Sequence, residues 1–434
     1  MFRASSKALA FGLIAGPLWA GDLPYDEPIF PDHPSAQIEL GQLLFYDPIL
    51  SGSKTVSCAT CHHPKHATGD GVSLGLGDGG AGLGPDRKVV ADNIPEQRIP
   101  RNAPPLFNLG ATEFTVFFHD GRLEQDASRP SGIRTPLGAE MEYGFASALS
   151  AQSMFPVLSA DEMAGHYAEN DVAQAVRQGL LTGQGGAWDI LSKRIEGIPA
   201  YRAGFDAVIG PKDITFTDIS DALAAFLDFE WRGVASPFDL YLRNGTEMEP
   251  AAMRGMDLFY GQAACADCHA GRFQTDHKFH AIAMPQIGPG KAARFESHAQ
   301  DTGRMRVTGN PKDAYAFRTP PLRNIAQTGP YGHTGAFATL EGVVRHHLDP
   351  ITSLYEYDIS QALLPGLKAD DLRVLNDAAE IEAIAMANTL QPQSLTDAEV
   401  TDILAFLGAL TDPQSVRGAL GIPASVPSGL PIDR

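Results

Sequence analysis

Cysteine is scarce in this chain, with four residues among 434. So few cysteines exclude the disulfide-dense scaffold on which small secreted domains depend. The four form two C-x-x-C pairs, each followed directly by histidine, in Cys58-Ala-Thr-Cys61-His62 and Cys265-Ala-Asp-Cys268-His269. Because no cysteine is left over, one type of site accounts for all of them.

Basic residues are also few. The chain has 33 lysines and arginines against 52 aspartates and glutamates, which gives a formal net charge of -19. Such an acidic chain argues against a nucleic-acid partner, because binding to DNA or RNA depends on basic side chains that contact phosphates. The charge fits a basic protein partner that is attracted electrostatically, and it equally fits a role in solubility alone.

Long apolar runs are missing, and no segment reaches the roughly 20 apolar residues of a membrane-spanning helix. The N-terminus has a basic start at Arg3 and Lys7, a short apolar run over residues 8–19, and the sequence Leu18-Trp19-Ala20 at its end. This arrangement is typical of a cleaved signal peptide. We therefore predict a signal peptide over residues 1–20, a periplasmic location, and no membrane span in the mature chain.

Strand signals are few as well, and glycine and proline are abundant between the helical segments. A weak internal repeat precedes the two cysteine pairs, as Gly41-Gln-Leu-Leu-Phe-Tyr46 and Gly255-Met-Asp-Leu-Phe-Tyr260. Each half also ends in an amphipathic helical pattern, and Thr396 and Glu399 predict a capping box at the start of the second one. The apolar positions of these two helices are Ile219, Leu223, Phe226 and Leu227, and Val400, Ile403, Leu404 and Leu407.

The repeat predicts two domains. We place them at residues 21–245 and 246–413, with an extended tail over residues 414–434. The glycine-rich stretch at residues 69–84 lacks the lysine of a phosphate-binding loop and the periodicity of a calcium repeat, so we predict a surface loop there.

The C-x-x-C-H pattern predicts haem attachment. Its two thiols add to the haem vinyl groups, and its histidine binds the iron. One such motif is also compatible with a thioredoxin-like redox pair or a zinc site. Two motifs in an exported chain without further cysteines favour two covalently bound haems c. The group opposite each histidine then decides the chemistry, since a six-coordinate iron passes electrons and an open iron binds oxygen species.

Further motifs make the chain similar to the family of bacterial di-haem cytochrome c peroxidases and MauG. The resemblance extends from about Pro31 to Pro413. Its segments R-N-x-P, W-D-G-R, P-L-R-N and P-Y-x-H-x-G correspond, in order, to Arg101-Asn102-Ala-Pro-Pro105, Phe118-His119-Asp120-Gly121-Arg122, Pro321-Leu-Arg-Asn324 and Pro330-Tyr-Gly-His333-Thr-Gly335.

The resemblance implies a mainly α fold of two cytochrome c-like domains that pack against each other, with long loops. It implies reduction of hydrogen peroxide to water at the haem on His62, with electrons that enter at the haem on His269. The donor would be a small exported cytochrome c or a cupredoxin. Two alternatives stay open: MauG-like oxidation of a protein side chain, and a di-haem cytochrome that only transfers electrons.

The family also implies a calcium ion between the haems. Its ligands correspond to the side chain of Asn102 and to the backbone carbonyls of Thr328 and Pro330, and oxygen ligands of this kind suit calcium. Without the family, Asn102 reads as a turn residue that bonds its own backbone. Arg122 of the W-D-G-R segment is expected to contact haem. Dimers are common in the family, so a homodimer is among the expected assemblies.

The sequence departs from the family pattern at two positions. The tryptophan that lies between the haems is replaced by His119, which would relay electrons or bond a propionate. The histidine that blocks the resting peroxidatic iron in better-known members is replaced by Ile94. No histidine occurs from residue 67 to residue 101. The iron on His62 is therefore expected to be open at rest.

Peroxide chemistry needs a base that takes one proton and returns it to the leaving oxygen. Glu140-Met141 matches a glutamate–methionine pair of the family, so Glu140 is predicted to do this, with Glu142 as a close rival. Composition alone favours a solvated loop glutamate at this place.

The sixth ligand of the second iron is predicted to be His347. The family has methionine or tyrosine at this position, and Leu340, Val343, Val344 and His347 fall on one face of a helix. His346 is rotated by about 100° from that face and is the alternative. Met284 is a weaker candidate, since no family position supports it.

Overall fold

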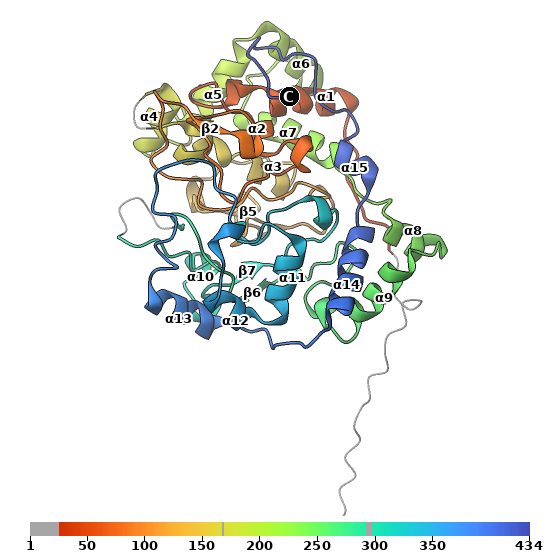
Figure 1. Ribbon diagram of the computed structural model, residues 1–434. Helices are drawn as coiled ribbons and strands as arrows, with labels where there is room; N and C mark the ends of the chain where they lie inside the picture. The colour runs from red at the N-terminus through yellow and green to blue at the C-terminus, as the bar shows by residue number, and fades with distance from the viewer. Residues whose placement is uncertain (1–25, 167–168, 292–296) are drawn as a thin grey trace, which may run out of the picture.

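The computed structural model describes residues 26–166, 169–291 and 297–434. The predicted signal peptide lies outside these ranges. The chain forms two helical domains, and Figure 1 shows the elements of the N-terminal half above those of the C-terminal half. No helix in the described ranges is both long and apolar enough to cross a lipid bilayer. The mainly α fold predicted from the sequence is confirmed.

The N-terminal domain is built around one apolar core that contains the fully buried Trp188 and Trp231. Thr215 caps its longest helix through a capping box with Asp218. Its helices are α1 (Ser35–Tyr46), α2 (Cys58–Cys61), α3 (Ala148–Ser153), α4 (Asp171–Arg177), α5 (Ala187–Glu196), α6 (Pro199–Ile209) and α7 (Phe216–Glu230).

The C-terminal domain has its own core, formed mainly between two of its helices. The capping box of Thr396 and Glu399 is confirmed. Phe238 belongs to this core, so the helix that carries it joins the C-terminal domain a few residues before the boundary at 245. The helices are α8 (Pro237–Asn244), α9 (Pro250–Tyr260), α10 (Met305–Thr308), α11 (Leu340–Leu348), α12 (Pro350–Tyr355), α13 (Ala378–Ala387), α14 (Asp397–Ala409) and α15 (Pro413–Arg417).

The strands of the described residues are short, as the lack of strand signals predicts. All pairs are antiparallel and none of the strands exceeds three residues. They are β1 (Gly80–Ala81), β2 (Lys88–Val89), β3 (Val116–Phe117), β4 (Leu123–Gln125), β5 (Ile133–Arg134), β6 (Phe279–His280) and β7 (Phe317–Arg318).

The glycine of the internal repeat marks a helix crossing in each domain. Helix α1 packs on α7, and α9 packs on α14. A Cβ atom at Gly41 would lie 1.9 Å from the carbonyl oxygen of Ala222, and one at Gly255 would lie 1.8 Å from that of Asp402. Only glycine allows the backbones to approach so closely. In both copies of the repeat, the glycine therefore lies where two helices cross closely.

The glycine-rich stretch is buried, so the prediction of a surface loop is wrong. Residues 72–80 are all buried in the structure. The C-terminal domain covers them: Ser73 exchanges two hydrogen bonds of 2.8 Å with Leu363, and Leu74 packs against Gly288. Composition could not reveal this, because glycine suits an exposed turn and a close backbone contact equally well.

The tail begins as helix α15 and then crosses back to the N-terminal domain. In Figure 1 the C-terminus lies beside α1, far from the C-terminal domain that precedes it. Val426 is buried in the N-terminal core, and Ile422, Leu430 and Ile432 pack against that core. The segment predicted as an extended tail thus lacks regular structure after α15 and is held to the N-terminal core by these apolar side chains.

Candidate functional site

The two C-x-x-C-H motifs lie in short helical turns that present their histidines in the same way. The first motif forms α2, and the second begins with the 3₁₀ turn η8 (Cys265–Asp267). Nδ1 of His62 is 2.9 Å from the carbonyl oxygen of Thr68, and Nδ1 of His269 is 3.0 Å from that of Gln274. Each Nδ1–H therefore donates to the backbone, which leaves Nε2 of each ring as a metal ligand.

The polar groups between the domains fit haem. Burial lowers the pKa of Arg318 to about 10, and no carboxylate pairs with it in the described part of the chain. A buried cation without a counter-ion is costly, so a negatively charged group such as a haem propionate suits this place. Nε2 of the buried His333 also lacks a partner among the described residues. These groups, the thiols and the two proximal histidines together fit haem c.

His347 faces His269 across the second site. The centroids of the two rings are 6.4 Å apart, and Nδ1 of His347 is 2.7 Å from the carbonyl oxygen of Val343. Two imidazoles on opposite sides of one metal, each with a bond of about 2 Å to it, have centroids roughly 6 Å apart. The spacing in this structure suits such a pair.

The side chains of His346 and Met284 make other contacts and do not face His269. Both ring nitrogens of His346 are engaged, Nδ1 with the Ser353 hydroxyl at 3.0 Å and Nε2 with the carbonyl oxygen of Ile282 at 2.8 Å. Burial lowers the pKa of His346 to about 3, so the ring is neutral at pH 7. Met284 packs with Tyr331 and Phe337 in a small separate cluster. Of the three candidate ligands, His347 is the one whose side chain lies against the ring of His269.

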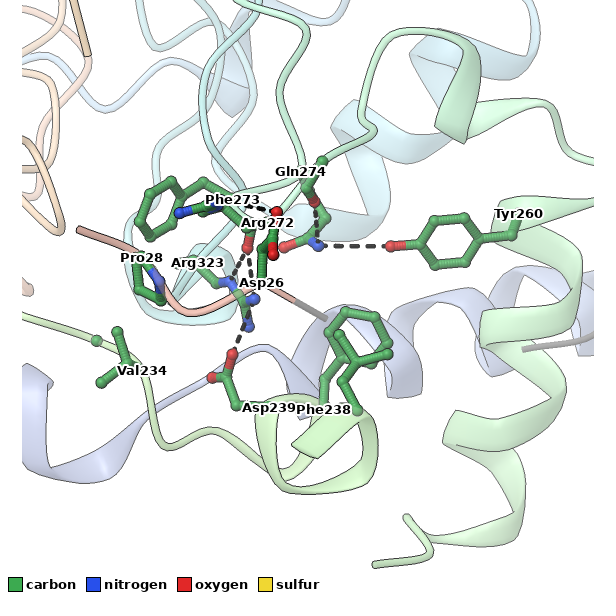
Figure 2. Close-up of a pocket in the computed structure, with 13 residues that line it drawn as sticks. Asp26, Pro28, Val234, Phe238, Asp239, Tyr260, Arg272, Phe273, Gln274 and Arg323 are labelled. Atoms are coloured by element: carbon green, nitrogen blue, oxygen red, sulfur yellow. Dashed lines mark hydrogen bonds and ion pairs between the residues drawn. The ribbon is translucent and has the colours of Figure 1, made fainter. Parts of the chain in front are cut away.

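A small cavity lies behind the second motif and shows how its proximal side is held. It has a volume of about 80 Å³. Figure 2 shows Gln274 at its edge, bonded through its amide to Tyr260, and Arg323 bonded to Arg272 and Asp239. The backbone carbonyl of Gln274 is the acceptor for His269. The walls of the cavity thus fix the loop that orients this histidine.

No histidine ring faces His62 at a similar distance in the part of the chain that the structure describes. Ile94, at the position of the family's blocking histidine, is 60% exposed. The loop that carries it is held by the C-terminal domain, since Nε of Arg98 lies 2.9 Å from both carboxylate oxygens of Asp371. The loop at this family position is therefore held to the C-terminal domain and contains no histidine.

Glu162 lies against this loop, and the sequence reasoning missed it. It belongs to the π-helical turn η7 (Ala160–Ala164), where a Cβ atom at Gly77 would lie 3.2 Å from the Cα of Glu162. Burial raises the pKa of Glu162. Burial raises the pKa of the Cys61 thiol, and the charges of Asp70 and, to a smaller extent, Glu162 add to this increase, so the Glu162 carboxylate lies near the first motif. Glu162-Met163 is one of three glutamate–methionine pairs in the sequence, with Glu140-Met141 and Glu247-Met248, so the pair alone could not single out Glu162.

Glu140 and Glu142 are placed differently. Glu140 ends the exposed 3₁₀ turn η5 (Gly138–Glu140), and its side chain has no hydrogen bond among the described residues. Glu142 accepts a long hydrogen bond of 3.4 Å from the amide of Gly183. The role predicted for Glu140 stays a prediction. Of the three glutamates, Glu162 is the one whose charge contributes to the pKa of the Cys61 thiol.

The W-D-G-R segment lies in a charged network between the domains. Arg101 pairs with Asp120 at 2.8 Å and with both oxygens of Asp301 at 2.7 and 2.8 Å. Arg122 pairs with Asp120 and lies 3.6 Å from the ring centroid of Phe118. This network joins the two domains.

His119 lies inside the same network. Its Nε2 is 3.1 Å from the carbonyl oxygen of Asn102. Burial, assisted by the charge of Arg101, lowers the pKa of His119 to about 4. The ring is therefore neutral at pH 7 and is bonded to the backbone.

The residues predicted to hold calcium are brought together in part. The backbone amide of Asn102 donates to the carbonyl of His333 at 2.9 Å, which joins the R-N segment to the P-Y-G-H segment. The side-chain amide nitrogen of Asn102 donates to Val72 and Ser73, so only its amide oxygen can serve as a ligand. The hydroxyl of Thr328 bonds Ile325, while Pro330 follows Gly329 in a cis peptide.

Comparison with known proteins settles the family. Residues 35–247 match the family of di-haem cytochrome c peroxidases. The methylamine utilization protein MauG of Methylorubrum extorquens is 30% identical over 330 residues, which cover 75% of this chain and 71% of that protein. The chain belongs to the di-haem cytochrome c peroxidase and MauG family. It is therefore an oxidoreductase with haem c cofactors.

Other relatives extend over nearly the whole chain. The cytochrome-c peroxidase IdrP1 of Denitromonas iodatirespirans is 27% identical over 421 residues, covering 91% of this chain and 86% of the relative. A solved MauG-like protein associated with microbial copper homeostasis has a TM-score of 0.56 at 26% identity, with coverage of 92% and 97%. The di-haem peroxidase BthA of Burkholderia thailandensis, at 23% identity and a TM-score of 0.61, shares the fold over 94% of this chain and 92% of its own.

Proposed function

We propose that this protein reduces hydrogen peroxide to water at the haem attached to Cys58 and Cys61, with electrons that enter at the haem attached to Cys265 and Cys268. We name these the first and the second haem. The observation that carries the proposal is the difference between the two iron sites. His347 faces His269, whereas no described histidine ring faces His62. One site is built for electron transfer and the other for a reaction at iron.

In this proposal His347 is the sixth ligand of the second haem. The bond from its Nδ1 to Val343 fixes the ring orientation, as partners of metal-bound histidines commonly do. His346 is unsuitable, because both its nitrogens are already bonded. A histidine in place of methionine lowers the potential of this haem, since a thioether favours the reduced iron.

Glu162 moves the proton at the first haem. A general acid–base works best when its pKa lies near the working pH, and burial raises the pKa of Glu162 in that direction. Arg122 and Lys291 are close enough to oppose that increase. The carboxylate takes a proton from bound peroxide and returns it to the leaving oxygen. The haem, when bound, supplies the iron that accepts the peroxide and the electrons that cleave it.

The fixed distal loop predicts activity without prior reduction. The loop has no histidine that could leave the iron, and Ser73 and Arg98 hold it to the C-terminal domain. Stopped-flow mixing of fully oxidised protein with peroxide should give a rapid spectral change. EPR of the resting protein should show one high-spin and one low-spin ferric signal. Absence of any reaction until one electron is added would show that a ligand blocks the first iron.

The remaining parts of the proposal follow the family. Calcium is held by the side chain of Asn102 and by the carbonyls of Thr328 and Pro330. The electron donor is a small exported cytochrome c or cupredoxin, which meets the acidic protein in the periplasm. Similarity to cytochrome c551 peroxidases of Nitrosomonas europaea and Pseudomonas aeruginosa supports the donor class.

Oxidation of a protein side chain is the second candidate, because MauG of Methylorubrum extorquens is similar over three quarters of this chain. The two candidates differ in what consumes the oxidising equivalents of peroxide. Steady turnover with a reduced c-type cytochrome, at one peroxide per two electrons, supports peroxide reduction. A slow return to the resting spectrum with donor present, and fast decay with a specific added protein, supports the MauG-like role.

A further inference from the structure

Residues 418–434, which we name the C-terminal strap, pack along the outside of the first haem motif. Helix α15 leads into the strap and packs against the 3₁₀ turn η3 (Pro64–His66), directly after His62. Figure 1 shows the end of the chain beside α1 and α2. The strap thus links the end of the C-terminal domain to the attachment site of the other domain's haem.

Polar bonds fix the first part of the strap to the helices of the N-terminal domain. The backbone amides of Leu420 and Gly421 donate to Glu230 at 2.7 and 2.8 Å. The amide of Gln42 donates to the carbonyl of Gly421 at 2.8 Å. Glu230 is 2% exposed, so these bonds satisfy a buried carboxylate. The strap is therefore part of the domain it crosses to.

A second anchor lies just before the first motif. The hydroxyl of Ser428 donates to the carboxylate of Asp47 at 2.6 Å, and the phenol of Tyr201 donates to the other oxygen at 2.7 Å. Asp47 is fully buried and follows α1 directly. Arg434 donates back to Pro423 and Ala424, so the strap also closes on itself.

The third anchor is inside the motif. The hydroxyl of Thr60, between Cys58 and Cys61, donates to the carboxylate of Asp433 at 2.7 Å and accepts the amide of Ser57 at 3.0 Å. Both roles of this hydroxyl are thereby fixed. The corresponding residue of the second motif is Asp267, which is exposed, whereas Thr60 is 1% exposed. The contact is therefore specific to the first haem.

We propose that the C-terminal strap is a positioning element for the first haem, and that Asp433 acts on this haem through Thr60. The strap fixes the helical turn that carries both thioether bonds, and it brings a carboxylate to the edge of the haem site. Charge and hydrogen bonding around a haem set its reduction potential, and a nearby negative charge favours the oxidised iron. The strap accordingly keeps the first haem at a lower potential than the same motif without it.

The test compares point variants of the holoprotein by spectroelectrochemical titration, which resolves the two haems. Asp433→Asn removes the charge and should raise the midpoint potential of the first haem, with that of the second unchanged. Thr60→Val should shift the same haem in the same direction. Asp433→Glu keeps the negative charge, so the midpoint potential of the first haem should stay close to that of the unmodified protein. Asp126→Asn is the matched control, because Asp126 is an exposed carboxylate of the same domain that bonds only its neighbours Ser128 and Arg129.

A second variant tests the strap as a whole. A chain that ends at Arg417 should still carry two haems by mass, and only the spectrum of the first haem should change. The proposal is overturned if Asp433→Asn leaves the first potential unchanged, if both haems shift equally, or if Asp126→Asn gives the same shift. Loss of both haems from the shortened chain would likewise contradict it, since the strap would then serve the whole fold.

Discussion

The two halves of the molecule use one scaffold for two purposes. In each, a helix with a glycine at its crossing packs on the closing helix, and a C-x-x-C-H motif follows. In each half, the motif histidine donates its Nδ1–H to a backbone carbonyl that follows it in sequence. The acceptor is Thr68, six residues after His62, or Gln274, five residues after His269. Attachment and proximal geometry are therefore common to both halves.

The opposite face of each site differs. His347 approaches His269 from helix α11, whereas no histidine ring of the described residues faces His62. The two sites therefore share the side that attaches the haem and differ on the side that decides the reactivity of the iron. Variants that remove or exchange these differences test this contrast.

The first prediction removes the acid–base group from the reactive half. Glu162→Gln should slow the reaction of oxidised protein with peroxide by about 10²–10⁴-fold, because general acid–base catalysis contributes on that order. Glu140→Gln is the control and should change the rate little, given its exposed position. The measurement is stopped-flow absorbance across pH. The opposite ranking of the two variants would restore Glu140 as the proton-transferring group.

The second prediction concerns a variant in which the iron of the second haem loses its proposed sixth ligand and becomes open, like the iron of the first haem. His347→Ala should convert the low-spin EPR signal to high spin, with the first haem unaffected. His346→Ala should leave both signals in place, since that ring bonds Ser353 and Ile282. An unchanged low-spin spectrum in the His347 variant would refute the ligand assignment.

The third prediction concerns the shared helix crossing. Gly41→Ala and Gly255→Ala should each destabilise the protein by about 1–3 kcal/mol or more, because the added methyl would overlap a backbone carbonyl. Thermal unfolding of the holoprotein measures the loss. Gly366→Ala is a control, because nothing lies within 4 Å of a Cβ atom at Gly366. Equal melting temperatures for all three variants would contradict the explanation of the repeat.

The fourth prediction concerns the charged network between the halves. Burial alone raises the pKa of Asp120, but Arg101 and Arg122 outweigh burial and hold it at about 2. A carboxyl with a lowered folded pKa stabilises the protein above its unfolded value of about 3.9 and loses that contribution as the pH falls toward 2. Thermal unfolding between pH 5 and about 2 should show the loss. Asp120→Asn should make the profile flatter over this range, and an identical slope would contradict the prediction.

The last prediction concerns removal of the proposed calcium ion. Its loss should change the interface between the two domains more than the structure of either domain. Chelation should slow electron transfer from the second to the first haem, because Asn102 and the P-Y-G-H segment would lose a shared ion. Pulse reduction followed by absorbance measures that rate, and added calcium should restore it. Asn102→Ala should have the slow rate with or without chelator. Metal analysis that finds no calcium in fully active protein would contradict this expectation.

Local sequence patterns were sufficient to predict several features of this protein. The C-x-x-C-H motifs predict attachment, because both thioether bonds and the iron bond come from five consecutive residues. The 3.6-residue periodicity predicted the closing helices, and the Thr396–Glu399 box predicted the start of one of them. The family motifs indicated the di-haem fold and the segments that meet between the two domains.

The surroundings of those motifs depend on the tertiary structure. It placed His347 rather than His346 against His269, a choice between neighbours on one helix that depends on which neighbours occupy each side. It buried the loop of residues 72–80, placed the half-buried Glu162 against that loop, and brought Asp433 to Thr60 across 373 positions of sequence. Burial and distant pairing depend on how the two domains and the strap pack together, and no local pattern records that arrangement.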